Sequence, residues 1–251
     1  ALDQMKNPRT GIVLTHTLDG PESSYTLKTS VYRFDYERSW NKLNRIGVET
    51  PSTVLANADD PAYAGYYGVL TGQLDTGSAA DALYIGPNHR SFVSQGIQSV
   101  LSTHVNTGPI EHRFESGIRF HYDHIKRLHT ESAYLMQGGT VVPADEPVIT
   151  TAHNFASTHA VAVHLTDAMT WKNLTLTPGA RVELISSQTE NYLTDEKKDA
   201  LVAAVMPGIG AYYEIIEHLG VLAGVYRGFS PPAPGSDANV KPEYSVNYEA
   251  G

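Results

Sequence analysis

The sequence predicts an all-β protein: an antiparallel up-and-down meander that forms part of a transmembrane β-barrel. Three observations predict this fold class. Apolar and polar residues alternate along much of the chain, Gly and Tyr are abundant at 21 and 15 residues, and short and long connections alternate between the predicted strands. A strand points successive side chains to opposite faces, and a barrel that spans a membrane turns an apolar face outward.

Period-two alternation is clearest in three stretches: "RFESGIRFHYD" (113–123), "LTLTPGARVEL" (174–184) and "VMPGIGAYYEI" (205–215). In the first, the side chains of Arg119, His121 and Asp123 share the polar face, opposite Phe114, Ile118 and Phe120. Each stretch is therefore predicted as a strand with one apolar and one polar face. In "YTLKTSVYRFDYERSW" (25–40) the apolar phase moves from odd to even positions, which predicts a β-bulge near Val31.

Nine segments are predicted as strands, near residues 11–18, 24–45, 91–105, 109–131, 152–168, 174–191, 201–215, 219–229 and 244–251. The connections alternate between short ones (19–23, 106–108, 169–173, 216–218) and long ones (46–90, 132–151, 192–200, 230–243). Alternate connections of a meander lie at the same end of the sheet. This sorting is typical of outer-membrane barrels, which have short periplasmic turns and long extracellular loops.

The longest predicted strands exceed what a bilayer requires. Residues 109–131 would extend about 75 Å at roughly 3.3 Å per residue. A membrane-spanning strand needs only about 9–11 residues. We therefore expect the wall of the barrel to continue above the membrane.

Local signals fill in the connections and the strand ends. In the connection 46–90, Asp60 as a cap and Pro61 at the first helical position predict a short helix. The prolines of 231–234 predict the end of the strand at 219–229, because proline donates no ladder hydrogen bond. Aromatic residues near the strand ends predict two membrane-boundary belts: Tyr25, Trp171 and Tyr213 at the short turns, and Tyr36, Trp40, Tyr226 and Phe229 at the long loops.

Composition excludes several functions. The net charge of −9 argues against a nucleic-acid partner, and the absence of cysteine excludes disulfides and zinc–thiolate sites. No catalytic or cofactor motif is present, so we expect neither an enzyme nor a bound cofactor. "HYDHIKRLH" (121–129) would suggest a metal site on a helix, but in a strand His121 and His124 point to opposite faces, so no metal site is predicted.

Five stretches carry a resemblance to a known family: "VYRFDYERSWNKLN" (31–44), "RSFVSQGIQSVL" (90–101), "LTLTPGARVE" (174–183), "GVYRGFSPPAPG" (224–235) and "KPEYSVNYEAG" (241–251). They resemble the barrel of a TonB-dependent outer-membrane receptor, most of all the ferric-citrate type. The matches follow family order from about residue 11 to residue 251.

The resemblance implies a 22-stranded barrel in the bacterial outer membrane, closed by an N-terminal plug and importing a ferric chelate with energy from the TonB complex. Residues 1–251 are then expected to be one partial barrel domain, without the plug and the C-terminal strands. The implied partners are ferric citrate or a siderophore, outer-membrane lipid, and TonB acting through the missing N-terminal region. A passive porin-like channel and a soluble all-β binding module remain as alternatives.

The resemblance fixes no ligand residue, so the candidates come from alternation. Arg119, His121 and Asp123 share the face expected to line the lumen, and Arg90 lies where a long loop meets a strand. An anionic ferric chelate needs cations, and arginine offers paired donors to carboxylates. The alternative is that these charges only contact water or the plug.

Overall fold

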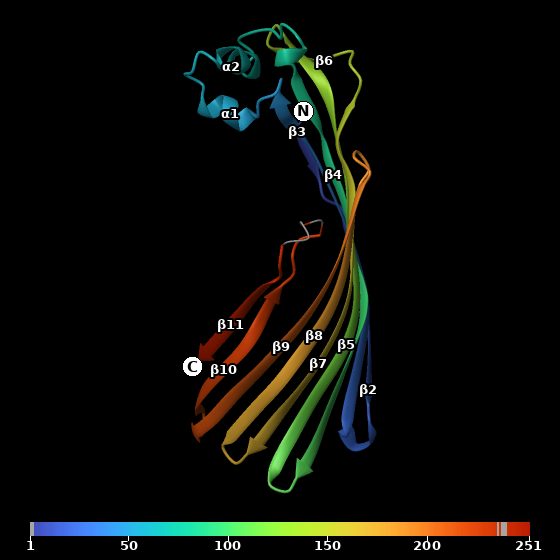
Figure 1. Ribbon diagram of the computed structural model, residues 1–251, viewed down its shortest axis with the longest axis vertical. Helices are drawn as coiled ribbons and strands as arrows, with labels where there is room; N and C mark the ends of the chain where they lie inside the picture. The colour runs from blue at the N-terminus through green and yellow to red at the C-terminus, as the bar shows by residue number, and fades with distance from the viewer. Residues whose placement is uncertain (1–2, 235, 237–239) are drawn as a thin grey trace.

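A computed structural model describes residues 3–234, 236 and 240–251, and it is one coiled antiparallel sheet with a small helical cap at one end (Figure 1). Within these residues the sheet has 11 strands. They are β1 (Gln4–Lys6), β2 (Arg9–Asp19), β3 (Tyr25–Ile46), β4 (Leu83–Thr107), β5 (Ile110–Gln137), β6 (Thr140–Pro143), β7 (Ile149–Trp171), β8 (Leu174–Asn191), β9 (Glu196–Ile216), β10 (Leu219–Ser230) and β11 (Glu243–Ala250).

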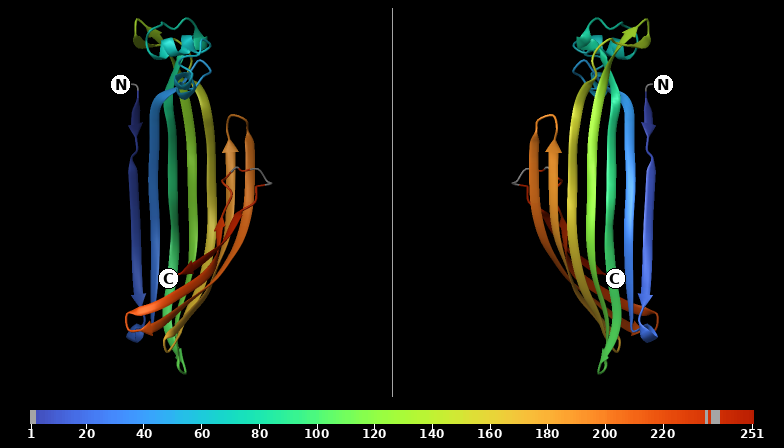
Figure 2. Two further views of the ribbon diagram at one scale, coloured as in Figure 1. Left: turned by 90° about the vertical axis from the view of Figure 1, so that its left-hand side faces the viewer. Right: turned by 90° about the vertical axis from the view of Figure 1, so that its right-hand side faces the viewer.

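The strands follow one another across the sheet in the order β1-β3-β4-β5-β7-β8-β9-β10-β11, and every pairing is antiparallel. β2 pairs β3 beside β1, and β6 folds back on β5 as a hairpin. The predicted up-and-down meander is confirmed. The described sheet is open, with β1 and β2 at one edge and β11 at the other, and it coils so that β10 and β11 run obliquely to β3 (Figure 2).

The wall formed by the strands is tall on one side and low on the other. β3, β4, β5 and β7 contain 22, 25, 28 and 23 residues, whereas β10 and β11 contain 12 and 8. Figure 1 shows the tall strands rising to the cap while β10 and β11 stop lower down. The prolines that follow Ser230 end β10 as predicted.

Three of the predicted long connections are shorter in the structure. In the connection 132–151, β5 continues to Gln137, β6 covers Thr140–Pro143 and β7 begins at Ile149. β4 begins at Leu83, so strand replaces part of the connection 46–90, and the prediction of a long loop at 192–200 is wrong. There β8 ends at Asn191 and β9 begins at Glu196. The amide of Leu193 donates to Asn191 Oδ1 at 3.0 Å, and Lys197 Nζ pairs with Glu190 Oε1 at 2.7 Å. The mixed charges of this run pair across strands rather than forming a solvated loop.

The predicted bulge near Val31 is also wrong. The pairing of β3 with β4 runs without interruption from Tyr25 to Leu43 and shifts only between Leu43 and Arg45. The apparent change of phase has another cause: both faces of β3 carry large apolar side chains, with Val31 on one and the rings of Tyr32, Phe34 and Tyr36 on the other.

Register separates the sheet into two faces. We call the face that carries Arg119 the inner face, because residues 231–234, 236 and 240–242 lie over it. On the outer face, one cross-strand row is apolar, and all its members except the half-buried Val161 are exposed: Leu14, Val31, Ile97, Phe120, Val161 and Leu184. The next row on the cap side is mostly polar: Ile12, Arg33, Gln95, Tyr122, His159 and Ser186. The apolar band therefore ends far below the cap.

The aromatic belt predicted at the long loops is wrong for three of its four members. Register places Tyr36, Trp40 and Tyr226 on the inner face, and only Phe229 on the outer face. The members of the lower belt, Tyr25, Trp171 and Tyr213, have the parity of the outer face. The position of a residue along its strand predicts how far up the wall its ring lies. Whether the ring lies on the inner or the outer face depends on odd or even position, so a shift of one residue reverses it.

The cap is formed by residues 47–82 and shares a small core with the upper ends of β3, β4 and β5. Its helices are α1 (Pro51–Ala56), α2 (Ala64–Leu70) and the short 3₁₀ helix η2 (Ala79–Asp81). Its core consists of side chains at most 5% exposed: Ile46, Val54, Val69, Leu83 and Met136. No helix among the described residues is long and apolar enough to cross a membrane.

The predicted cap helix is present but starts later. α2 begins after Tyr63, and Asp60 instead accepts a hydrogen bond from the amide of Ala62 at 2.9 Å in the preceding turn. α1 was missed, although it has a clear start signal. Thr50 accepts from the amide of Thr53 at 3.1 Å, and Pro51 occupies the first helical position.

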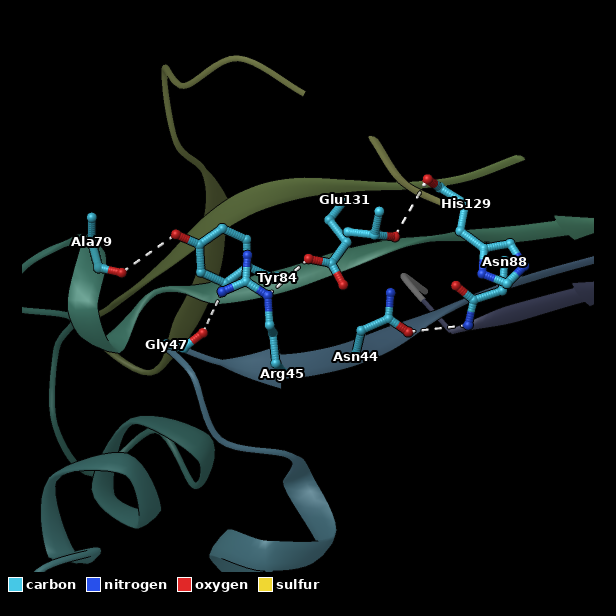
Figure 3. Close-up of polar contacts among 9 residues, drawn as sticks. Asn44, Arg45, Gly47, Ala79, Tyr84, Asn88, His129 and Glu131 are labelled. Atoms are coloured by element: carbon cyan, nitrogen blue, oxygen red, sulfur yellow. Dashed lines mark hydrogen bonds and ion pairs between the residues drawn. The ribbon is translucent and has the colours of Figure 1, made fainter. Parts of the chain in front are cut away.

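The base of the cap is fixed to the wall by Arg45 (Figure 3). Its Nε donates to Glu131 Oε2 at 2.9 Å, its guanidinium lies 3.4 Å from the centroid of the Tyr84 ring, and it also donates to the carbonyl of Gly47. The carboxylate of Glu131 is buried, so this ion pair lies largely away from solvent. Gly47 has φ of 56°, which favours glycine.

Replacing Arg45 by Met is expected to loosen the cap, because the buried Glu131 carboxylate would lose its counter-charge. The expected loss of stability is about 2–3 kcal/mol. Hydrogen exchange should accelerate across residues 47–82 and stay unchanged in the lower strands. The matched control is Arg113→Gln, which breaks the exposed pair with Glu111 and should change little. Equal protection of the cap in both variants would contradict this role.

Candidate ligand-binding surface

The four predicted site residues all lie on the inner face, but at two heights. Arg119, His121 and Asp123 lie together on β5. Arg90, on β4, pairs in register with Arg127, which is eight positions further along β5 than Arg119. At roughly 3.3 Å per residue, that separates the two places by about 26 Å along the wall. The structure therefore divides the predicted set into a lower and an upper group.

The lower group is a chain of hydrogen bonds that starts at Arg119. Its Nη2 and Nε lie 2.8 and 3.1 Å from the hydroxyl oxygen of Tyr32. That hydroxyl lies 2.6 Å from His121 Nδ1, and His121 Nε2 lies 3.2 Å from Asp123 Oδ2. Because arginine can only donate, the Tyr32 hydroxyl accepts from Arg119 and donates its O–H to His121 Nδ1, and the Nε2–H of the same ring donates to Asp123 Oδ2.

In this series of hydrogen bonds, Arg119 is held by the neutral hydroxyl of Tyr32 rather than by a carboxylate. The guanidinium lies 5.5 Å from the centroid of the Tyr32 ring, so its charge is oriented without being neutralised. Tyr32 was not among the predicted site residues. The signal that could have identified it is an aromatic ring in phase with charged residues of the neighbouring strands.

A cavity of about 950 Å³ lies beside these hydrogen-bonded residues, between the inner face and residues 231–234, 236 and 240–242. Its floor includes the small side chains Ala160 and Ala162, and its roof is rich in proline. Arg181 also lines it and pairs with Glu183 at 2.6 Å.

The upper group is a row of three arginines, which we call the arginine row. Arg38, Arg90 and Arg127 are register partners on β3, β4 and β5, so their side chains are neighbours on the inner face. Among the described residues none of them forms an ion pair, and the Nε atoms of Arg38 and Arg127 are buried without a hydrogen-bond partner. The hydrogen bond found for Arg90 is a long one of 3.4 Å to His129 Nε2.

Burial and repulsion between like charges both destabilise the charged side chains of the arginine row. Burial lowers the pKa of Arg90, and the charges of Arg38 and Arg127 lower it further. Burial, followed by the charges of Arg90, Arg127 and Arg38, also lowers the pKa of His129. Two unit charges about 6 Å apart repel by roughly 3 kcal/mol at an effective dielectric constant of about 20. An anion bound at the row would remove this repulsion.

Arg38 and Arg127 were missed by sequence reasoning. Arg127 shares the odd phase of Arg119, His121 and Asp123, so alternation alone could have placed it on the same face. Its proximity to Arg38 required the register between three strands. Within the described residues, no group of three or more His, Asp or Glu side chains is arranged to hold a metal ion directly.

The fold and the surface define a class of protein. A tall antiparallel meander with an apolar band on its outer face and a row of cations on its inner face has the architecture of a section of a β-barrel wall. The chain matches the family "TonB dependent receptor-like, beta-barrel" over residues 3–251 and belongs to that family. The family consists of transporters and receptors of the bacterial outer membrane.

Solved structures give the same fold. The ferric citrate transporter FecA in its unliganded form is similar with a TM-score of 0.71 and 19% identity, over 99% of this chain and 32% of its own. The siderophore receptor PiuA from Acinetobacter baumannii is similar with a TM-score of 0.67 and 14% identity, over 98% of this chain and 37% of its own. The ferric-catecholate import receptor Fiu from E. coli K12, in its closed form, has a TM-score of 0.67 and 13% identity, over 100% of this chain and 38% of its own.

The chain spans about a third of the length of these receptors. At such low identity the similarity establishes the fold of the wall and leaves the ligand undetermined. No curated protein matches the chain in sequence.

Replacing Arg90 by Gln is expected to raise the pKa of His129, because Arg90 is the largest charge contribution to its depression after burial. In the wild type, the pKa of His129 is lower in the folded protein than the ordinary value of 6.5. As the pH falls through 6.5, the unfolded chain therefore protonates His129 before the folded protein does, and acid destabilises the folded state. NMR titration of labelled histidine checks the shift. Lys126→Gln removes a cation from the opposite face of β5 and should leave the pKa of His129 unchanged; equal shifts would contradict the proposed geometry.

Proposed function

We propose that this chain is a section of a 22-stranded outer-membrane barrel whose complete protein imports an anionic ferric chelate with energy from the TonB complex. Residues 1–251 form one partial barrel domain in this proposal. Family membership supports the transporter class. The similar solved structures include a ferric citrate transporter and a ferric-catecholate import receptor, which supports a ferric chelate as the ligand.

The arginine row is the observation that carries the choice of an anionic ligand. The chain has a net charge of −9, yet Arg38, Arg90 and Arg127 gather on the inner face with no carboxylate paired to them in the described residues. Neighbouring like charges destabilise a sheet. A ferric chelate with carboxylate or other anionic oxygens supplies the missing negative charge through paired, charge-assisted hydrogen bonds.

The lower group has a second role in the proposal. Arg119, His121 and Asp123 line the cavity under residues 231–234, 236 and 240–242, about 26 Å further down the wall from the arginine row. Arg119 faces this cavity with its charge held by Tyr32 rather than cancelled. We infer that a chelate received at Arg90 and its neighbours meets Arg119 next on its way through the lumen.

The outer face supports the position in the membrane. Its apolar row at Val31, Ile97 and Phe120 faces lipid in our proposal, and the polar row at Arg33, Gln95 and Tyr122 marks the outer boundary. The wall above that boundary, with the cap, then stands outside the cell. The arginine row belongs to this external part, where a ligand from the medium arrives first.

A passive channel would use the same wall, so energy dependence is the decisive test. The complete receptor is expressed in bacteria that lack their own ferric-chelate receptors, and uptake of radioactive iron is measured with and without TonB. Active import predicts uptake only when TonB is present. Uptake without TonB would establish a passive channel instead, and no uptake of any ferric chelate would overturn the proposal.

The arginine row is expected to set the affinity for the chelate. Single substitutions Arg38→Gln, Arg90→Gln and Arg127→Gln should each weaken binding by about 10-fold or more, because hydrogen bonds to charged groups contribute about 1.5–3 kcal/mol. Affinity is measured on the purified receptor by calorimetry.

The matched control is Arg33→Gln, on the opposite face of β3. Arg33 is paired with Asp35 at 2.8 Å and is exposed, so its removal should leave affinity unchanged. A triple variant of the arginine row that binds as tightly as the wild type would exclude the row as the ligand site.

A further inference from the structure

Three side chains on the outer face form a hydrogen-bonded series beside the short turn between β4 and β5. Thr107 Oγ1 lies 2.7 Å from His112 Nε2, and His112 Nδ1 lies 2.8 Å from Asp167 Oδ2. Thr107 ends β4, His112 lies on β5 and Asp167 lies on β7. We call these residues the outer-face triad. A hydroxyl on one imidazole nitrogen and a carboxylate on the other is the arrangement of a nucleophile, a general base and the group that orients the base.

The hydrogen bonds give each member of the triad a defined role. When His112 Nδ1–H donates to Asp167, the Nε2 atom carries no hydrogen and accepts from the Thr107 hydroxyl. The ring of Phe114 is stacked on the imidazole, with the centroids 5.6 Å apart and the planes at 6°. The side chains of His112 and Asp167 are only 15% and 17% exposed, whereas Thr107 is exposed. The base is therefore shielded, and the hydroxyl is open to a substrate.

Two polar groups beside these side chains have no partner among the residues that the structure describes. Gly108 follows Thr107 with φ of 60°, its N–H forms no hydrogen bond there, and no atom lies within 4 Å of where a Cβ would stand. The N–H of the residue after a nucleophile is a common donor to an oxyanion. Asp167 Oδ1 is buried without a hydrogen bond. Its negative charge thus remains available to stabilise an imidazolium at His112.

The outer-face triad lies at the height of the lower aromatic belt. Tyr25 belongs to the cross-strand row of Asp167, and Trp171 and Tyr213 belong to the second row below it. Rings of such belts lie at the level of lipid headgroups, where the ester bonds of glycerophospholipids are also found. An ionisable pair on the lipid-facing side of a barrel is rare, and such pairs mark functional sites. The position therefore matches an ester substrate that is part of the membrane.

The geometry points to a second activity of this wall: hydrolysis of a fatty acyl ester of a glycerophospholipid in the periplasmic leaflet, with Thr107 as the nucleophile. The inference uses the membrane position proposed above and does not depend on the ferric ligand. It goes beyond transport, which is the function of the family. No sequence motif predicts the site, because register alone brings Asp167 to His112 from 55 positions away.

The reaction has two steps. In the first, Thr107 Oγ1 attacks the ester carbonyl carbon, and its proton moves to His112 Nε2. The bond from this carbon to the glycerol oxygen breaks, and that oxygen takes the proton, which yields a lysophospholipid and an acyl ester on Thr107. In the second, water attacks the acyl carbon and gives a proton to His112 Nε2. The Thr107 oxygen leaves and takes this proton, so a fatty acid is released and the site is restored. Gly108 N–H donates to the oxyanion in both steps.

The test measures release of radioactive palmitate by the complete receptor, purified from bacteria that lack their own outer-membrane phospholipase. The receptor is reconstituted in vesicles of phosphatidylethanolamine and phosphatidylglycerol with labelled palmitoyl chains. The variants are Thr107→Val, His112→Gln and Asp167→Asn, and Thr107→Ser is the conservative variant that retains a hydroxyl. The matched controls are Thr29→Val and His16→Gln, which are register partners on the outer face of β3 and β2.

We expect the wild type to release palmitate and each of the first three variants to lower the rate by about 100-fold or more, because they remove the nucleophile, the base or the group that orients it. Thr107→Ser should retain activity, and both controls should match the wild type. Circular dichroism and heat-resistant migration on gels check that every variant is folded. Import of iron is measured on the same variants, and Thr107→Val should import as the wild type does.

Three results would overturn the inference. The first is a wild type that releases no more palmitate than Thr107→Val, which includes equal release by all variants from a contaminating enzyme. The second is a folded Thr107→Ser receptor as inactive as Thr107→Val. The third is an equal loss of activity in Thr29→Val or His16→Gln. A receptor that imports iron and releases no palmitate would leave the importer proposal in place, whereas release of palmitate without import would leave only the esterase.

Discussion

The uninterrupted backbone ladder of the tall strands is the constraint on which the rest of the structure depends. β3 pairs β4 without a shift from Tyr25 to Leu43, and β4 and β5 continue the same rows. Along such a ladder the face of every side chain is decided by parity, and a single slip would exchange the two faces. One register therefore sets the apolar band, the arginine row and the inward-facing rings of β3 together.

That coupling explains why the inner face can tolerate unfavourable groups. The repulsion between Arg38, Arg90 and Arg127 acts across strands that are held by many ladder hydrogen bonds above and below the row. The row cannot relax by shifting one strand, because the shift would turn the outer apolar side chains inward. The strain is local, whereas the ladder and the buried cap core stabilise the wall over its whole length. Such tension is a reason to interpret the row as a ligand site rather than as a structural feature.

Sequence alternation predicted the meander, the face of Arg119, His121 and Asp123, and the end of β10, because these depend on one strand at a time. It could not predict what depends on two strands. The proximity of Arg38 to Arg90 needs the register between β3 and β4, and the Tyr32–His121 hydrogen bond joins residues 89 positions apart. The missed turn at 192–195 has the same origin, since Glu190 and Lys197 favour it only when they face each other.

The aromatic residues of β3 show why position along a strand alone does not predict a membrane belt. Tyr36 and Trp40 stand near the long-loop end of β3, and height alone suggested a membrane belt. Their even parity turns them inward, beside Arg38, so they cannot contact lipid. The polar outer row at Arg33 also lies below both rings, so the outer apolar band ends before it reaches them. Both rings have partners within the protein. Tyr36 is packed by Arg9 and Phe92, and Trp40 donates its Nε1–H to Asp3 Oδ1 at 3.2 Å while the charge of Lys42 lies 4.6 Å from its ring centroid. The register that turns these rings inward thus provides them with neighbours, whereas the arginine row on the same face has no carboxylate partner among the described residues.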